Sequence, residues 1–543
     1  MKKILTSMAA LCAAALAYSQ NLDPVVEVTN AFKREAEGIE KPSQLLPLPD
    51  SVSRFNLDFD YSVKSKPYNG AYEFNPYLVE MHPSAMPSGE HKLYLSAGAG
   101  YALRPELDVF WNPVRRKNIR ADIYATHRSY IGNYRNIVVG SGPLEYDGTS
   151  AGDGINANTV AGASFLYGYR SGIFTADISY RNIAASDLFA DESYSFNPVR
   201  LHHRGQAKLR VKGGNKFKYE VGTRFGMGGY EGNNEQFMAA DLHLSTKVFK
   251  TVLSIDGALD AVSYADGMAA KWEIVPHYVR TRGRLSTSIG VKLSGVMHTN
   301  VEDYEYKPAF IFPDVHIDFA LFRRALVLQA GATGGNKMHT YDSLLGANPY
   351  LAGYYWTRDV SVERFNVWAG ARGSIAGRFS YDAKVGYQWM DNAFGWSYFS
   401  DLTPTMVYVS PLKTFYVDVV AGWKSSSWDI SANVHYGNTP MPRLKTEVEK
   451  NVFAPAPFLA RGHVLYTWNG RIKGGATIEA RSAMKGKNPV PAYQDLGLVA
   501  EYAFSRNITF WLKGGNLLGQ SIQRIPFHAE GGIYAVAGLR MVL

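Results

Sequence analysis

Side chains that could perform catalysis are thinly scattered along this sequence. The thirteen histidines do not cluster, and no His-Glu-x-x-His motif occurs. The only cysteine, Cys12, lies in an N-terminal segment that we expect to be removed, which excludes a disulfide, a thiolate metal site and a cysteine nucleophile in the mature chain. We therefore predict a protein that is not an enzyme and that has no catalytic residues, cofactor or metal site.

Charged residues two positions apart point to different chemistry. Asp382 with Lys384, and Glu479 with Arg481, are each separated by one alanine. Residues i and i+2 of a β-strand lie on the same face, so these pairs predict a strand face that meets water, as in the lumen of a wide barrel. The alternative is that they are solvated wall residues without a binding role. The predicted lumen lining is Asp382, Lys384, Asp429, His435, Lys473, Glu479 and Arg481.

The opposite faces of the same segments are apolar. From Phe174 to Arg181 the residues alternate strictly between apolar and polar, and the pattern recurs over residues 380–389, 428–436 and 495–504. A soluble sandwich would also show this alternation. However, aromatic residues gather at the strand ends on the apolar face, as in the interfacial girdles of membrane barrels. The expected fold is therefore all-β, a transmembrane antiparallel β-barrel.

Composition excludes other classes of protein. Hydrophobic residues make up 46% and charged residues 19% of the 543, and 10 Trp, 35 Tyr and 27 Phe are present. So many aromatic residues exclude disorder, and no apolar run after the N-terminus is long enough for a membrane helix. The formal net charge of +9 is spread over a long chain, so nucleic acid is not an expected partner.

Turn signals give the strand count. Short turns are expected at sites such as 171–172, 376–377 and 469–470, and they alternate with longer connections near residues 131–155, 184–197, 338–360, 391–410, 438–455 and 519–529. Short turns on one rim and long loops on the other are typical of outer-membrane barrels. From His91 to Leu543 we expect about 22 strands, with short periplasmic turns and long extracellular loops.

The N-terminus has the pattern of a secretory signal. Lys2 and Lys3 precede an apolar run from Ile4 to Leu16 and a small-residue cleavage site. We expect residues 1–19 to be the signal peptide, residues 20–90 a periplasmic or lumenal segment, and residues 91–543 the barrel. The expected location is the outer membrane of a Gram-negative bacterium.

The last forty residues resemble a known family. Residues 508–520 read Ile-Thr-Phe-Trp-Leu-Lys-Gly-Gly-Asn-Leu-Leu-Gly-Gln, and a glycine-rich segment follows from Gly531 to Arg540. The pattern resembles the last two strands of TonB-dependent outer-membrane receptors. The overall texture is similar to chains from Bacteroidetes. The resemblance implies a barrel of about 22 strands that takes part in solute uptake.

The chain also departs from the family. Residues 20–90 are too few for the usual plug domain, so a reduced plug or a linker is expected in its place. Residues 25–29, which are Val25, Val26, Glu27, Val28 and Thr29, resemble the short segment that pairs with TonB by strand addition. An ordinary strand or an extended linker is the alternative for them.

Two functions remain open at this stage. One is uptake through a porin-like channel, with aromatic residues of the extracellular loops as an outer binding surface. The other is a non-transporting barrel that serves as a structural or docking subunit of an envelope complex. Expected partners are outer-membrane lipid and lipopolysaccharide, TonB, and a periplasmic or surface protein. The loop aromatics are Tyr341, Tyr350, Tyr354, Tyr355 and Trp356.

Overall fold

The structure is a computed structural model. It describes residues 92–101, 103–138, 149–186, 199–264, 267–298, 310–322, 325–351, 360–398, 404–441, 451–529 and 531–543. The predicted signal peptide, the segment 20–90 with its proposed TonB-contact residues, and Tyr354, Tyr355 and Trp356 lie outside these residues. Within the described ranges no helix is long and apolar enough to cross a membrane.

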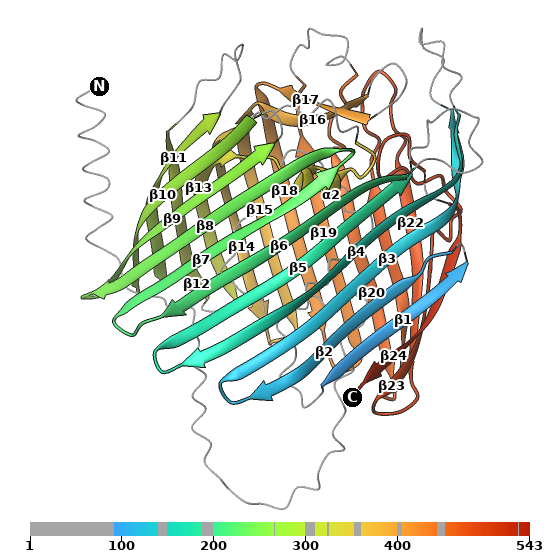
Figure 1. Ribbon diagram of the computed structural model, residues 1–543, viewed down its shortest axis with the longest axis horizontal. Coiled ribbons are helices and arrows are strands. Elements are labelled where there is room, and N and C mark those ends of the chain that lie inside the picture. The colour runs from blue at the N-terminus through green and yellow to red at the C-terminus, as the bar shows by residue number, and fades with distance from the viewer. Residues whose placement is uncertain are drawn as a thin grey trace, which may run out of the picture.

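A closed antiparallel barrel of 22 strands forms the body of the molecule (Figure 1), which confirms the predicted fold class and strand number. Each barrel strand pairs with its neighbour in sequence, and β1 pairs with β24 to close the ring. The barrel strands are β1 (Leu93–Tyr101), β2 (Glu106–Arg116), β3 (Ile119–Val138), β4 (Thr149–Tyr169), β5 (Gly172–Ser186), β6 (Val199–Gly213), β7 (Phe217–Tyr230), β8 (Asn233–Val248), β9 (Thr251–Tyr264), β10 (Gly267–Arg282), β11 (Leu285–His298), β12 (Ile311–Phe322), β13 (Leu326–Lys337), β14 (Ser361–Ile375), β15 (Phe379–Asp391), β18 (Leu412–Lys424), β19 (Trp428–Asn438), β20 (Phe458–Trp468), β21 (Ile472–Arg481), β22 (Tyr493–Ala503), β23 (Ile508–Gly515) and β24 (Tyr534–Val542).

Alternation along each strand separates an apolar outside from a polar inside. Ile178 is 67% exposed and Leu498 53% exposed, although both are large apolar residues in regular strands. The polar residues Ser179 and Asp495, at alternate positions of the same two strands, are buried instead. An apolar outer surface of this kind suits a lipid environment and would be costly in water.

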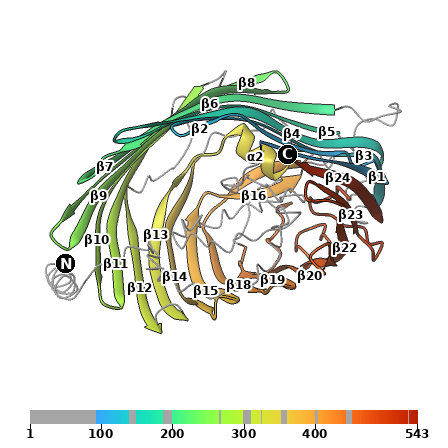
Figure 2. The same cartoon turned by 90° about the horizontal axis from the view of Figure 1, so that it is seen from below.

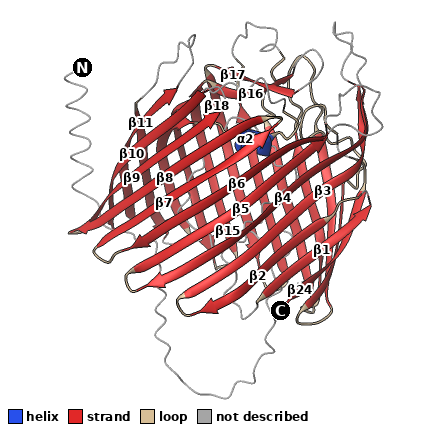
Figure 3. Cartoon of the chain, in the orientation of Figure 1, coloured by secondary structure: helices blue, strands red, loops and turns tan. Residues whose placement is uncertain are grey.

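The two rims differ as the sequence predicts. The rim that holds both ends of the described barrel, Lys92 and Leu543, has tight turns, such as those at Gly377 and Gly470, where φ is +65° and +64°. Most connections at the opposite rim are longer (Figure 3). The described parts of the expected connection 131–155 are strand instead, because β3 and β4 continue their pairing as far as Val138 and Thr149.

Three further elements lie at the long-loop rim. They are the helix α2 (Tyr341–Ala347) and the strands β16 (Ala393–Tyr398) and β17 (Pro404–Val409), which pair only with each other. Seen from the short-turn end, α2 and β16 lie within the ring of strands (Figure 2). These elements therefore occupy the interior of the barrel near its long-loop rim.

The outer face provides the first testable prediction. Ile430 on β19 lies between Trp423 and Val464, which are both exposed on the outside. It is two residues from the short-turn end of the strand, so we expect Ile430→Arg to cost about 1–2 kcal/mol, between the costs at the interface and at the bilayer midplane. Asn433→Arg on the lumenal face of the same strand should fold normally. Urea unfolding in lipid vesicles measures both, and equal tolerance would contradict a membrane-facing outer surface. Ser431 is unsuitable as the lumenal control because it is buried and its Oγ lies 2.8 Å from His463 Nδ1.

Candidate functional site

Connections at the long-loop rim pack against one another inside the barrel (Figure 2). We use the term loop cap for residues 338–351, 392–398, 404–411, 451–457, 482–492 and 516–529. These segments and the upper ends of β5 and β7 share one apolar core. Its members are Ile183, Ala185, Tyr230, Tyr341, Leu344, Leu345, Ala347, Tyr350, Leu351, Phe394, Trp396, Tyr398, Met406, Phe453, Ala456, Met484, Val490, Ile525, Phe527 and Ala529.

The helix α2 forms because both its cap and its buried face are encoded locally. The Thr340 side chain accepts a hydrogen bond from Ser343 N, and the Ser343 side chain accepts one from Thr340 N, which makes a capping box. Leu344 and Leu345 project into the apolar core and are 5% and 1% exposed. A helix of only seven residues would not persist alone in water, so its packing must stabilise it.

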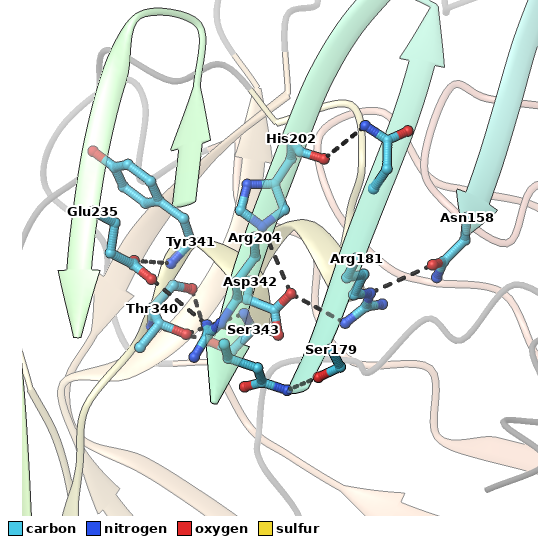
Figure 4. Close-up of polar contacts among 12 residues, drawn as sticks. Asn158, Ser179, Arg181, His202, Arg204, Glu235, Thr340, Tyr341, Asp342 and Ser343 are labelled. Atoms are coloured by element: carbon cyan, nitrogen blue, oxygen red, sulfur yellow. Dashed lines mark hydrogen bonds and ion pairs between the residues drawn. The ribbon is translucent and has the colours of Figure 1, made fainter. Parts of the chain in front are cut away.

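Asp342, in the first turn of α2, anchors the helix to the barrel wall (Figure 4). Arg181 Nη1 lies 3.3 Å and His202 Nε2 3.6 Å from its Oδ1, while Arg204 Nη1 lies 3.7 Å from Oδ2. The three wall residues come from β5 and β6, far from α2 in sequence. Burial by itself would raise the pKa of Asp342, but His202 and the two guanidinium charges together lower it well below its ordinary value.

Glu235 on β8 provides a second contact for the same helix. Its Oε2 accepts a hydrogen bond of 2.7 Å from Tyr341 N, and its Oε1 lies 3.6 Å from Arg204 Nη1. Glu235 is 1% exposed and Arg204 8% exposed. Arg204 also lies over the ring of Phe237, 3.6 Å from its centroid. The anchor thus combines two carboxylates with two guanidinium groups in a largely buried site.

His339 precedes the helix and packs against another part of the cap. Its ring centroid lies 5.2 Å from that of Phe394, and its Nε2 lies 2.8 Å from Ser361 Oγ. Burial, together with the charge of Lys337, lowers the pKa of His339 to about 4. The imidazole is therefore neutral near pH 7 and suited to an aromatic environment.

The last connection, residues 516–529, has its own buried anchor on the far wall. Arg524 Nη2 lies 2.5 Å from Asp495 Oδ2, and its Nε lies 3.3 Å from Glu479 Oε1. All three side chains are less than 10% exposed. Asp495 also accepts a 2.7 Å hydrogen bond from Asn516 N, and Glu479 one from the Tyr493 hydroxyl. This network fixes both the start and the middle of the connection to β21 and β22.

Tyr350 joins the two anchored parts. Its ring stacks on His528 with centroids 3.8 Å apart, and its hydroxyl lies 3.3 Å from that of Tyr134. Its carbonyl accepts a 3.2 Å hydrogen bond from Arg200. Tyr341 and Tyr350 are only 8% and 4% exposed, so the prediction of an outer binding surface is wrong for these two loop aromatics. Residues 338–351 fold inward, because the apolar side chains of the other connections provide a core for them.

The predicted lumen residues lie on the face opposite the exposed apolar side chains, and their surroundings differ. Lys384 Nζ lies 3.5 Å from Asp382 Oδ2, and neither is fully buried. The same inner face of the barrel carries Asp429, His435 and Lys473. Asp429 lies near His463, and His435 lies 2.6 Å from Asp418. Glu479 and Arg481 are buried beneath the last connection, where Arg481 Nη1 donates to the Arg524 carbonyl. These two residues therefore belong to the anchor of the loop cap instead of a solvated wall.

Sequence reasoning missed the loop partners of both anchors. Asp342 and Arg524 lie in connections with no periodic pattern, and their partners are up to 161 residues away. The one local signal was the Thr340–Ser343 capping pair, which marks a helix start within an expected loop. Among the described residues, no group of three or more His, Cys, Asp or Glu side chains is placed to hold a metal ion.

Comparison with known proteins identifies the fold. No protein-family model and no curated protein matches the sequence. A mutant of the ferric enterobactin receptor PfeA from Pseudomonas aeruginosa superposes with a TM-score of 0.61 at 11% identity, covering 83% of this chain and 80% of that one. The FrpB iron transporter from Neisseria meningitidis gives 0.62 at 9% identity, covering 83% and 82%. The FpvAI–pyocin S2 complex gives 0.61 at 11%, covering 84% and 70%. At these identities the similarity concerns the fold.

Proposed function

We propose that this protein is an outer-membrane barrel of a Gram-negative bacterium, similar to TonB-dependent receptors, that takes part in solute uptake. The observation that carries the proposal is a 22-strand barrel with an apolar outside, a charged inside and an anchored loop cap within its long-loop end. The fold shared with an enterobactin receptor and an iron transporter supports it. The outer face would contact membrane lipid and lipopolysaccharide.

The loop cap narrows the lumen at the long-loop rim, which we take to be extracellular. A barrel of 22 strands is too wide for wall side chains alone to fill it. The described connections fill part of the interior with a core resembling that of a folded domain. In this proposal the loop cap narrows the path at the long-loop rim and rearranges to admit the solute, and residues 20–90 narrow the path from the periplasmic side.

The segment 20–90 is tested by deletion. We expect a variant lacking residues 20–89 to show higher conductance in planar bilayers than the full mature chain, because the described loop cap fills only part of the interior and the segment adds a second barrier. The same deletion should admit antibiotics that the intact membrane excludes. If conductance is unchanged, the segment does not fill the lumen, and a docking subunit of an envelope complex becomes the better proposal.

Energy coupling through residues 25–29 is tested separately. Val26→Pro removes a backbone donor from the strand that we propose to add to TonB, so energised uptake should be lost while the barrel assembles normally. Val26→Ile keeps the donor and serves as the control. Uptake that survives the proline would indicate a passive channel.

A further inference from the structure

The group that receives Asp342 belongs to the permanent wall of the barrel. Arg181, His202 and Arg204 project inward from β5 and β6, which are held by continuous strand pairing. Asp342 itself belongs to a short helix in a connection. If α2 moved away, the three wall side chains would stay in place. Two guanidinium groups would then face one remaining carboxylate, that of Glu235, which leaves an excess of positive charge.

The fit between this carboxylate and the wall is loose. The three contacts to Asp342 measure 3.3, 3.6 and 3.7 Å, whereas tight charge-assisted hydrogen bonds to a carboxylate are about 2.7–2.9 Å. One buried wall donor, Arg204 Nε, has no hydrogen-bond partner within the described part of the chain. Donor capacity is therefore left over while Asp342 occupies the group.

Exposure shows which member of the contact a solute would meet first. The Asp342 side chain is 25% exposed and that of Arg181 20%, but Arg204 is 8% and His202 1% exposed. An incoming carboxylate could therefore reach the Asp342–Arg181 edge without prior unfolding, and would gain the buried donors only by displacing Asp342. This displacement replaces the Asp342 carboxylate with that of the solute, so the net charge of the site does not change.

We propose that Arg181, His202 and Arg204 form a binding site for a carboxylate group of the transported solute, which Asp342 occupies as a built-in competitor. The inference rests on the proposed uptake function in one respect, namely that the ligand is the transported solute. Binding of the solute releases α2 and thereby loosens the loop cap. The ligand can shift the equilibrium toward the open cap only by the difference between its binding free energies for the open and the closed arrangements.

Hydrogen exchange and calorimetry on the purified full mature chain in nanodiscs test the proposal, with succinate as the probe. Succinate should accelerate exchange of the Leu344 and Asn348 amides, which bond to the carbonyls of Thr340 and Leu344, at least fivefold. Succinamide, which has a similar shape and no charge, should have no effect at equal ionic strength.

Three variants separate binding from anchoring. Asp342→Asn should exchange quickly without ligand and bind succinate at least tenfold more tightly than the wild type. Arg204→Gln, or the more exposed Arg181→Gln if the former does not fold, should lose succinate binding. Asp418→Asn, which breaks a 2.6 Å contact with His435 on another wall, should behave as the wild type.

Two results would overturn the inference. One is an Asp342→Asn variant that releases α2 but binds succinate no more tightly, since Asp342 would then only anchor the helix. The other is succinate binding that survives loss of either arginine. Both readouts use purified protein and need no transport, so they remain interpretable if uptake itself is disproved.

Discussion

Replacing Arg524 with methionine should detach the last connection from the barrel wall. The substitution keeps most of the side-chain volume but leaves Asp495, which is 1% exposed, without its cationic partner. Breaking a buried ion pair from one side costs about 3–5 kcal/mol, because the remaining charge is uncompensated. Glu479 is less affected, since Arg461 Nε remains 2.8 Å from its Oε2. We expect faster hydrogen exchange at the Gln520 and Phe527 amides and a higher conductance.

A double mutant identifies the cause. Asp495→Asn added to Arg524→Met removes the stranded charge and should restore much of the protection, so the two changes should be strongly non-additive. Arg210→Met serves as a matched control, since Arg210 is 53% exposed and pairs at 3.1 Å with Glu220, which is 34% exposed, and an exposed ion pair contributes at most about 1 kcal/mol. Additive effects of Arg524→Met and Asp495→Asn would show that their contact does not hold the connection.

The barrel could be predicted from the sequence because its rules are local. Strand alternation has a period of two, so the faces of 174–181 and 428–436 follow from neighbouring residues alone. Turn residues such as Asn469 and Gly470 mark strand ends, and the count then follows. The same rule placed Asp382 and Lys384 on the inner face of β15.

The loop cap could not be predicted in this way. Its contacts join connections that are distant in sequence, such as Tyr350 with Tyr134, which are 216 residues apart. A loop rich in aromatics can either face solvent or pack against other loops, and only the partners decide between these outcomes. Glu479 is an example. Strand alternation predicts that its side chain faces the lumen, but its burial depends on Arg524, which is distant in sequence.

Leu345→Asp should open the loop cap more completely than any change at its anchors. Leu345 is 1% exposed in the shared apolar core, where Leu→Ala alone would cost about 2–5 kcal/mol. A carboxylate adds a desolvation cost that no described neighbour in that core offsets, so α2 should leave the core. Because the barrel strands pair independently of α2, assembly into the membrane should be unaffected.

Conductance and permeability measure this opening. We expect Leu345→Asp to raise the conductance in planar bilayers and the sensitivity of cells to large antibiotics. Leu345→Met, which nearly conserves the volume and stays apolar, should cost less than about 1.5 kcal/mol and remain closed. If neither variant raises the conductance, the loop cap does not limit the path, because α2 leaves the core in Leu345→Asp. Residues 20–90 would then be the barrier. If both are open, the cap depends on the shape of Leu345 more than on its apolar character.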